Sequence, residues 1–355
     1  MTHPIYLRDS DIVQGWDGDV ARLVDLLDEE FSRWKAGSIM LPEKASQIID
    51  ETTQSRVNCM PSTLLEQEVS GVKLVSVFPE NPTSNLPNVM GQIVLLSAAD
   101  GSTIAVLDAA FITALRTALV GGLAARYLAP REPKTIGLLG AGEQAQMHLL
   151  VFASLFPSLN TCYVASRHAS SEKRLQASLA SNVENMNVIC CDSDYEKAAW
   201  DADIIVTAIS GQVPLLKPEW VKKGSFYCHV GGREDEYGVA LKSDKIVCDC
   251  WEALKHRGSP TLSLMHKQGL LSDDDIYADL GDLTTNKKCG REFSDEIIYF
   301  NSIGLAFTDM AIAHALYEQC ASKGLGTDLG KYAPVSIFDN EKFASLLNAS
   351  RIGCK

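Results

Sequence analysis

The sequence predicts an α/β protein of two domains, one built on a parallel sheet with helices on both faces and the other of α+β type. Its 355 residues exceed the usual size of a single domain. Between residues 130 and 304, short apolar runs of strand length alternate with amphipathic helical segments, which is typical of a doubly wound sheet. Before residue 130, strand-like runs follow one another between helical patterns, which favours an α+β domain.

The first domain is predicted to span residues 1–129. Residues 11–34 carry apolar side chains at helical spacing. Strand-like runs bounded by turn residues follow at 69–78, 91–97 and 104–107, and an Ala- and Leu-rich helix is expected at 115–128. Another helix, at 305–320, begins a C-terminal helical segment (305–350) that we expect to complete this domain for substrate binding and dimerisation.

The second domain, residues 130–304, reads as a dinucleotide-binding domain of the Rossmann type. Buried strands are expected at 135–139, 162–165, 188–190, 203–208, 225–229 and 245–248. Helices are expected between the first four of them, at 143–154, 170–179 and 195–200.

Charge and composition exclude several classes of partner. Lys and Arg number 32 against 45 Asp and Glu, a net charge of −13, and no Lys/Arg run is longer than two, which argues against nucleic acid and anionic membranes. No apolar run approaches the roughly 20 residues of a membrane span, and the polar N-terminus does not resemble a signal peptide. Ten cysteines without metal-ligand spacing fit a cytoplasmic protein. Asp273–Asp275 follows Ser272 as in a capped helical turn, so no metal site is predicted.

A glycine-rich turn joins the first strand of the second domain to its helix. It has the sequence Gly140-Ala-Gly142-Glu143-Gln144-Ala145. In this context the first glycine permits the tight turn, the second lets the backbone approach a pyrophosphate, and Ala145 packs the helix on the sheet. The free N–H groups of the helix then bind phosphate oxygens.

The next strand indicates which dinucleotide binds. It ends in Ser166-Arg167-His168, with no acidic residue to bind a ribose 2′-hydroxyl. An Arg at this place accommodates a 2′-phosphate, so NADP(H) is favoured and NAD(H) remains open. Thr207 and Ser210 end a later strand at the same edge and are predicted to line the cofactor groove.

Three cations in the first domain are candidates for binding an acid group. Lys73 lies in an apolar strand, where an unpaired charge is costly unless it faces a cleft. Arg116 lies in an Ala/Leu-rich helix, and Lys44 stands two residues after Pro42. Together they would suit a carboxylate, with a bidentate Arg and movable Lys donors.

The chain resembles the ornithine cyclodeaminase/mu-crystallin family over roughly residues 5–325. The motifs that carry the resemblance are Pro42-Glu-Lys44, Met60-Pro61, Gly71 to Pro79, Leu115-Arg-Thr117, the glycine turn with His148, and Asn301-Ser-Ile-Gly304. Asp249 to Glu252, Lys255 to Arg257, Asp275 to Tyr277 and Arg291 to Ile298 look most similar to the subgroup of N-(2-amino-2-carboxyethyl)-glutamate dehydrogenases, which form 2,3-diaminopropionate for siderophores.

The resemblance implies roles for particular residues. Lys44, Lys73 and Arg116 would hold the α-carboxylate, with Lys73 also moving a proton. Ser302 and Gly304 would lie by the nicotinamide, and Thr117 and His229 are further candidates for the cofactor site. At the end of its strand, His229 is also a candidate acid/base, with a structural role as the alternative. Cyclodeaminases carry an Asp directly after a Gly-Gly pair, but here Arg233 follows, so Glu234 or Asp235 would have to substitute as the group that acts on the amine.

The function expected is that of an NAD(P)-dependent oxidoreductase acting on the C–N bond of an amino or imino acid. It would oxidise an amino acid or a secondary-amine conjugate to an imine that water hydrolyses, or reduce an imine in the reverse direction. Two alternatives stay open, a redox-neutral cyclodeaminase and a non-catalytic NADPH- and ligand-binding protein of the mu-crystallin type. The family also implies a homodimer.

Overall fold

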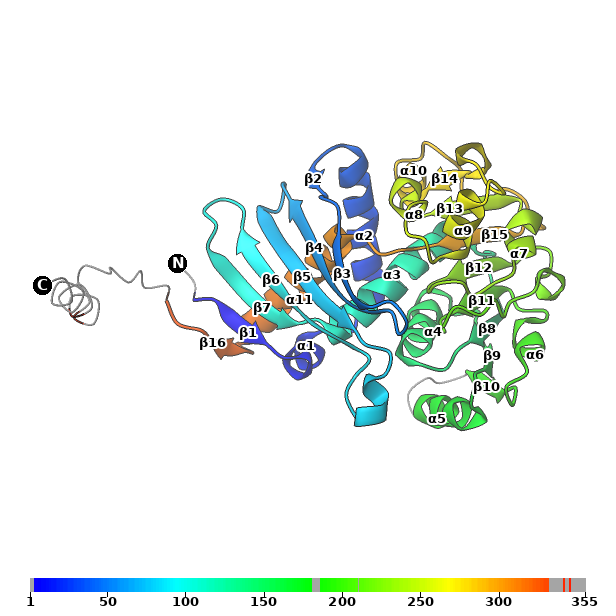
Figure 1. The fold of residues 1–355 in the computed structure, drawn as a ribbon, viewed down its shortest axis with the longest axis horizontal. Helices are drawn as coiled ribbons and strands as arrows, with labels where there is room; N and C mark the ends of the chain where they lie inside the picture. The colour runs from blue at the N-terminus through cyan, green and yellow to red at the C-terminus, as the bar shows by residue number, and fades with distance from the viewer. Residues whose placement is uncertain (1–2, 181–185, 210, 332–340, 342–344, 346–355) are drawn as a thin grey trace, which may run out of the picture.

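The computed structural model describes residues 3–180, 186–209, 211–331, 341 and 345. Two sheets stand side by side, with helix α3 (Ala110–Leu128) running between them (Figure 1). In the described residues, sheet A has the order β16-β1-β7-β6-β5-β4-β2 with β3 paired to β4, and sheet B has the order β10-β9-β8-β11-β12-β15-β13-β14. The α/β class with a parallel doubly wound sheet, predicted from the sequence, is confirmed.

Sheet A is mainly antiparallel and is covered on one face by helices. Its strands are β1 (Ile5–Leu7), β2 (Ile39–Met40), β3 (Ala45–Asp50), β4 (Ser55–Leu64), β5 (Val69–Val77), β6 (Val89–Ser97), β7 (Thr103–Asp108) and β16 (Thr327–Asp328). Helix α11 (Ala306–Ser322) packs on β4, β5 and β6, and it also contacts α3 and α2 (Val20–Lys35). Fully buried Leu27, Phe31, Leu115 and Phe307 join these helices to the sheet in one core.

The first predicted helix is wrong in its extent. Residues 11–34 form two helices, α1 (Asp9–Gly15) and α2, separated by a turn. Gly18 adopts φ +81° in that turn, and the Asp19 side chain accepts a hydrogen bond from the Arg22 amide (3.0 Å) to cap α2. The periodic apolar pattern continues across the break, which is why periodicity alone joined the two helices.

Sheet B is parallel throughout and has eight strands in the described residues. They are β8 (Thr135–Leu139), β9 (Thr161–Ala165), β10 (Asn187–Cys190), β11 (Ile204–Thr207), β12 (Phe226–His229), β13 (Lys245–Cys248), β14 (Ala278–Asp279) and β15 (Ile298–Asn301). The six predicted strands are present, but the prediction missed β14 and β15. The second omission matters because β15 lies between β12 and β13 and leads directly into the Asn301 to Gly304 motif.

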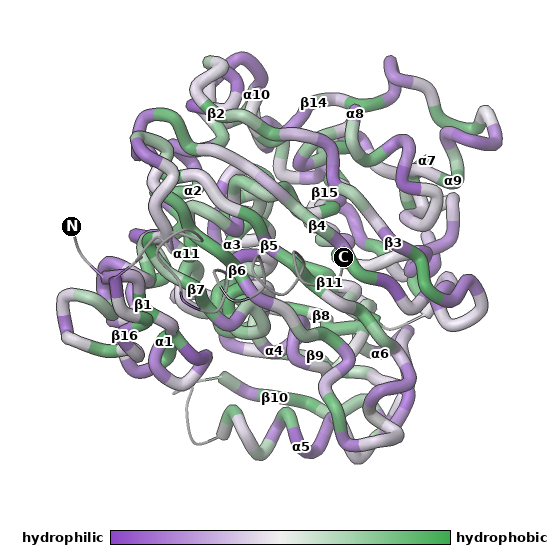
Figure 2. The backbone as a smooth tube through the Cα atoms, turned by 60° about the vertical axis from the view of Figure 1, so that its left-hand side comes forward, coloured by the Kyte–Doolittle hydropathy of each residue, from purple (hydrophilic) through white to green (hydrophobic). Residues whose placement is uncertain are grey.

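Helices cover both faces of sheet B. The predicted helices correspond to α4 (Glu143–Leu155), α5 (Ala169–Ala180) and α6 (Tyr195–Ala199). Beyond them the structure has α7 (Tyr237–Lys242), α8 (Trp251–Leu254), α9 (Thr261–Lys267) and α10 (Leu280–Thr284), with 3₁₀ turns η1 (Asn81–Ser84), η2 (Pro218–Trp220) and η3 (Asp273–Asp275). Hydrophilic and hydrophobic residues alternate along α5 at the outer edge, whereas β8 inside the molecule is mostly hydrophobic (Figure 2).

The two sheets divide the chain near residue 130, as the proposed domain limits would require. Strands of sheet A come from residues 5–108 and 327–328, and those of sheet B from 135–301. The domain limits themselves stay a prediction. Of the expected 305–350 segment, α11 returns to sheet A, while residues 332–340, 342–344 and 346–350 lie outside the described part. No helix among the described residues is both long and apolar enough to cross a membrane.

Candidate active site

Two of the three predicted cations meet on one buried carboxylate. Lys73 Nζ donates to Asp309 Oδ1 at 2.6 Å, and Arg116 Nε donates to the same oxygen at 2.8 Å. The three side chains come from β5, α3 and α11, and those of Lys73 and Asp309 are fully buried. Sequence reasoning missed Asp309, although it is the only acidic residue in the apolar run 305–317.

The third cation, Lys44, lies close enough to the first two for their positive charges to lower its pKa. Burial, and after it the positive charges of Arg257, Arg56, Lys73 and Arg116 in that order, together lower the pKa of Lys44 to about 7. Burial and the charge of Arg116 likewise lower the pKa of Lys73 to about 8, although Asp309 opposes the shift. Both lysines can therefore exchange a proton near neutral pH.

A loop from sheet B closes over Arg116. Gly304 has φ +78°, and a Cβ at this position would lie 2.4 Å from Arg116 Nη1, so only glycine lets the guanidinium pack here. Asp249, another residue without a predicted role, holds the loop because its Oδ2 accepts from the amides of Ile303 and Gly304, both at 2.9 Å. Its position directly after the apolar strand 245–248 is the signal that could have found it.

The remaining predicted residues of this region flank the same junction. Ser302 follows β15 and is nearly buried. Thr117 stands beside Arg116 on α3, where its hydroxyl donates to the Thr113 carbonyl at 2.7 Å. The structure therefore brings Lys73, Arg116, Thr117, Ser302 and Gly304 to the junction of the two sheets, at the carboxyl edge of sheet B.

The glycine turn fits a pyrophosphate. Gly140 has φ +127° and lies so close to β11 that a Cβ would meet the Ala208 carbonyl oxygen at 2.3 Å. Gly142, in contrast, has nothing within 4 Å of its Cβ position, which leaves open space beside the helix. Helix α4 begins at Glu143 and Gln144 without a side-chain cap, so its first amides face that space, and Ala145 is buried against the sheet.

Among the described residues, no free carboxylate follows directly at the end of β9. Glu172 lies nearby, but its oxygens accept from the amides of Ser166 (2.8 Å), Asp192 (2.8 Å) and Ser193 (2.9 Å). Arg167 and His168 are exposed at this edge, and the Ser166 hydroxyl donates to the His168 carbonyl (2.9 Å). Of the other predicted groove residues, Ser210 lies outside the described part of the chain.

Glu234 is buried beneath the nucleotide edge and bound to the loops around it. Its carboxylate accepts from the Thr207 hydroxyl (2.7 Å) and from the amides of Ile209 (2.7 Å) and Gly231 (2.8 Å). Burial raises the pKa of Glu234 to about 7. The side chains of Glu234 and Thr207 are fully buried. Their hydrogen bonds therefore hold together the ends of β11 and β12.

Asp235 and His229 form a second buried group. Asp235 Oδ1 accepts from the hydroxyls of Thr261 (2.6 Å) and Tyr299 (3.0 Å) and lies 3.4 Å from His229 Nε2. Burial raises the pKa of Asp235 to about 7 and lowers that of His229 to about 3, so the imidazole is neutral at neutral pH. Arg233, in the position after the Gly-Gly pair, lies over the Tyr237 ring at 5.5 Å.

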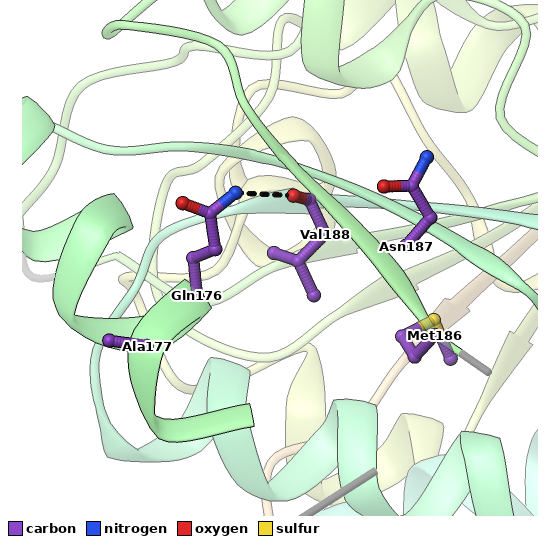
Figure 3. A pocket seen from close by; sticks show the side chains of 5 residues that line it. All are labelled: Gln176, Ala177, Met186, Asn187 and Val188. Carbon is purple, nitrogen blue, oxygen red and sulfur yellow. Dashed lines mark hydrogen bonds between the residues drawn. The ribbon is translucent and has the colours of Figure 1, made fainter. Parts of the chain in front are cut away.

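Two further sequence features are placed away from this site. Asp273–Asp275 forms a single 3₁₀ turn in which Asp275 accepts from the Ser272 amide and hydroxyl, both at 2.7 Å. A hollow of about 400 Å³ between α5 and β10 is lined by Gln176, Ala177, Met186, Asn187 and Val188 (Figure 3). It lies at the β10 edge of sheet B, away from Asp249, and none of the described residues that line it is charged.

Several similar proteins are named as dehydrogenases or reductases of amino or imino acids. The chain is 27% identical over 333 residues to the N-((2S)-2-amino-2-carboxyethyl)-L-glutamate dehydrogenase of Staphylococcus aureus, covering 92% of this chain and 98% of that one. It is similar to the Δ(1)-pyrroline-2-carboxylate reductase of Thermococcus litoralis in complex with NADH and L-proline (TM-score 0.86, 26% identity, 92% and 100% covered). It is also similar to an archaeal alanine dehydrogenase dimer with bound NAD (TM-score 0.84, 27% identity, 93% and 100% covered).

The sequence motifs, the two-sheet fold and the cation site point to the same relationship. The sequence model of the ornithine cyclodeaminase/mu-crystallin family matches residues 15–324, which are most of the chain. The family resemblance predicted from the motifs is thereby confirmed. The chain belongs to the ornithine cyclodeaminase/mu-crystallin family.

Proposed function

We propose that this protein is a nicotinamide-dependent oxidoreductase acting on the C–N bond of an amino or imino acid. The observation that carries the proposal is the pair Lys73 and Arg116 on Asp309, packed against the Gly304 loop at the carboxyl edge of a dinucleotide-binding sheet. Relatives of this family named as dehydrogenases and reductases support the same chemistry.

The cations hold and orient the substrate. Arg116 and Lys44 bind the α-carboxylate, and Lys73 binds beside them, so that the α-carbon faces the Gly304 loop. A bound nicotinamide supplies the hydride chemistry at that carbon. Lys73, whose pKa is about 8, accepts the proton of the substrate amine in oxidation and returns it in reduction.

The buried acids act as positioning residues in this proposal. Glu234 fixes the loops that follow β11 and β12, and Asp235 is held beneath them by the hydroxyls of Thr261 and Tyr299, so that neither carboxylate reaches the substrate amine. Arg233 stands where a cyclodeaminase carries its Asp, and a cation there would repel a protonated substrate amine. These contacts favour oxidoreduction over cyclodeamination.

The substrate class is that of the similar Staphylococcus aureus enzyme. We propose that the chain splits a secondary-amine conjugate of two amino acids by oxidation and hydrolysis, as in 2,3-diaminopropionate formation. A panel of amino acids and such conjugates, offered with NADP+ and NAD+ separately and followed at 340 nm, tests this. A conjugate should produce reduced cofactor, a cyclodeaminase would consume ornithine without net reduction, and a purely binding protein would turn over nothing.

Gly142→Val tests the glycine turn. Because nothing lies within 4 Å of the Gly142 Cβ position and the residue has φ −80°, the variant should fold with unchanged melting temperature. The added side chain would occupy the space for the pyrophosphate, so dinucleotide affinity should fall by about 100-fold, the loss of one to two charge-assisted hydrogen bonds. Fluorescence titration with reduced cofactor measures this affinity. If Gly142→Val bound the dinucleotide as tightly as the wild type, the pyrophosphate would lie elsewhere.

NADP(H) is the cofactor we propose. Arg167 is exposed where a 2′-phosphate would lie, and the carboxylate of Glu172 is occupied by backbone amides. Arg167→Ala should weaken NADPH binding by about tenfold to 100-fold, the value of a hydrogen bond to a charged group, and leave NADH binding within threefold. Equal effects on the two dinucleotides would contradict the preference.

A cytoplasmic homodimer is the assembly we propose. The face of sheet A opposite α11 carries the partly exposed apolar side chains of Cys59, Pro61, Val72, Leu74 and Val94. Such a face is typical of an interface between subunits, and the similar archaeal alanine dehydrogenase is a dimer. Light scattering should give twice the chain mass, and Leu74→Arg should give the mass of one chain.

A further inference from the structure

The candidate site holds more positive charge than one carboxylate requires. Besides Lys73 and Arg116, the site includes Lys44, Arg56 and Arg257, whose charges act on one another. Within the ranges that the structure describes, no carboxylate lies within ion-pair distance of these last three cations. Such a concentration is unexpected in a chain of net charge −13, and uncompensated like charges destabilise the empty site.

The cations extend well beyond the α-carboxylate position. On sheet A, Arg56 pairs with Val77 and Met60 pairs with Lys73, so Arg56 and Lys73 belong to the same face but are offset by four residues. At about 3.3 Å per residue, their backbones are roughly 13 Å apart. The Arg56 guanidinium also donates to the Gln54 carbonyl (2.9 Å), in the turn before β4 and farther from Lys73. Arg56 is thus directed to a different anion position from Lys73.

Arg257 faces that second position from sheet B. It lies in the loop after α8, its side chain is exposed, and the surrounding protein and the charge of Arg56 lower its pKa. The charge of Asp249 opposes this lowering of the pKa of Arg257, but the Asp249 oxygens already accept from three backbone amides, those of Cys250, Ile303 and Gly304. An exposed cation crowded by protein and by another cation is typical of an open cleft that binds an anion.

The phosphates of a bound dinucleotide would not reach the cations Arg56 and Arg257. The glycine turn follows β8, and Arg257 lies in the loop beyond β13, four strands away across sheet B. Adjacent strands are about 4.8 Å apart, so the two places are separated by roughly 19 Å. With the phosphates expected at the glycine turn, the substrate is the component that we infer to bring an anion to Arg257.

We propose that Arg56 and Arg257 form a second carboxylate subsite, which binds a second carboxylate of the amino or imino acid substrate. The α-carboxylate binds Lys73 and Arg116 together with Lys44, which lies near both positions. This inference rests on the proposed function, because it assigns the α-carboxylate to Lys73 and Arg116. It adds two specificity-determining residues, Arg56 and Arg257, to the site.

Matched 2-oxo acids test the subsite without knowledge of the natural substrate. With the protein saturated by reduced cofactor, calorimetry compares oxaloacetate, 2-oxoglutarate and 2-oxoadipate with 2-oxobutanoate, 2-oxopentanoate and 2-oxohexanoate, in which a methyl group replaces the second carboxylate. At least one diacid should bind about tenfold more tightly than its matched monoacid, the value of one charge-assisted contact. Arg257→Met and Arg56→Met should each remove most of that ratio.

The controls separate this inference from the proposed function. Arg131→Met removes an exposed Arg far from the site and should leave the ratio unchanged. Monoacid and cofactor affinities should stay within threefold in Arg257→Met and Arg56→Met. If monoacids bind but no diacid is preferred, or the ratio survives both substitutions, the subsite is overturned and the proposed function stands. If a substitution weakens the cofactor instead, the cations bind phosphate and the subsite is overturned. If no 2-oxo acid binds at all, both proposals fail.

Discussion

Replacing Lys73 with Met should lower kcat/KM for amino-acid oxidation by about 1,000-fold, within the range of general acid–base catalysis. The variant removes the amine that accepts the substrate proton and one donor to the α-carboxylate. Stopped-flow and steady-state measurements at 340 nm determine the loss. Cofactor affinity should stay within twofold, because the glycine turn lies on the other sheet.

Lys73→Met should also keep the fold. Met has nearly the length of Lys, and Arg116 still pairs with Asp309 at 2.8 Å, so no buried charge is left without a partner. Lys134→Met, at an exposed position, is the matched control and should retain full activity. Wild-type turnover in Lys73→Met would remove this residue from the mechanism, whereas a loss of cofactor binding would indicate a wider structural effect.

How far the sequence predicts the fold depends on how each strand is buried. Strands of sheet B such as Ile204–Thr207 are buried on both faces and therefore read as continuous apolar runs. Strand β4 is buried on one face and contains Arg56, Asn58, Pro61 and Ser62, so its apolar signal is weak. Strand β15 (Ile298–Asn301) is likewise buried on both faces and contains an apolar run, so the sequence carries a signal for it that the prediction missed. Its place between β12 and β13, in contrast, is set by tertiary packing, which no local pattern records.

The same distinction applies to the site. Lys73 and Arg116 could be found because each is a charge in an apolar element. Their partner Asp309 is 193 residues from Arg116, and nothing local connects the two. Arg56 and Arg257 come from different sheets, so their proximity depends on how the sheets meet. A sequence therefore indicates which charges need a partner, and the fold decides which partner each one meets.

Asp309→Asn should change the pH dependence of the reaction as well as its rate. In the wild type, kcat/KM for oxidation should rise as pH passes about 8, where Lys73 loses its proton. Asp309 raises the pKa of Lys73, while burial and Arg116 lower it, so removing the carboxylate should move this limb to lower pH. In the reductive direction, where Lys73 must carry the proton, activity should fall over the same interval.

The free energy of unfolding of Asp309→Asn provides an independent check, because its change with pH has a predicted direction. At pH 6 the substitution leaves Lys73 and Arg116 without their carboxylate, which should reduce the free energy of unfolding by about 3 kcal/mol. Above the lowered pKa of Lys73, the Lys73 amine of the variant is neutral in the folded state but still protonated in the unfolded state. The free energy of unfolding of the variant therefore rises with pH. The stability of the wild type shows no such rise until pH 8, so the difference in free energy of unfolding between wild type and Asp309→Asn should narrow as the pH increases.

Asp25→Asn, which breaks the exposed pair with Arg126, is the control and should change neither the free energy of unfolding nor the pH profile of the rate. A deficit that is constant with pH, together with an unshifted rate profile, would mean that Asp309 does not set the protonation of Lys73.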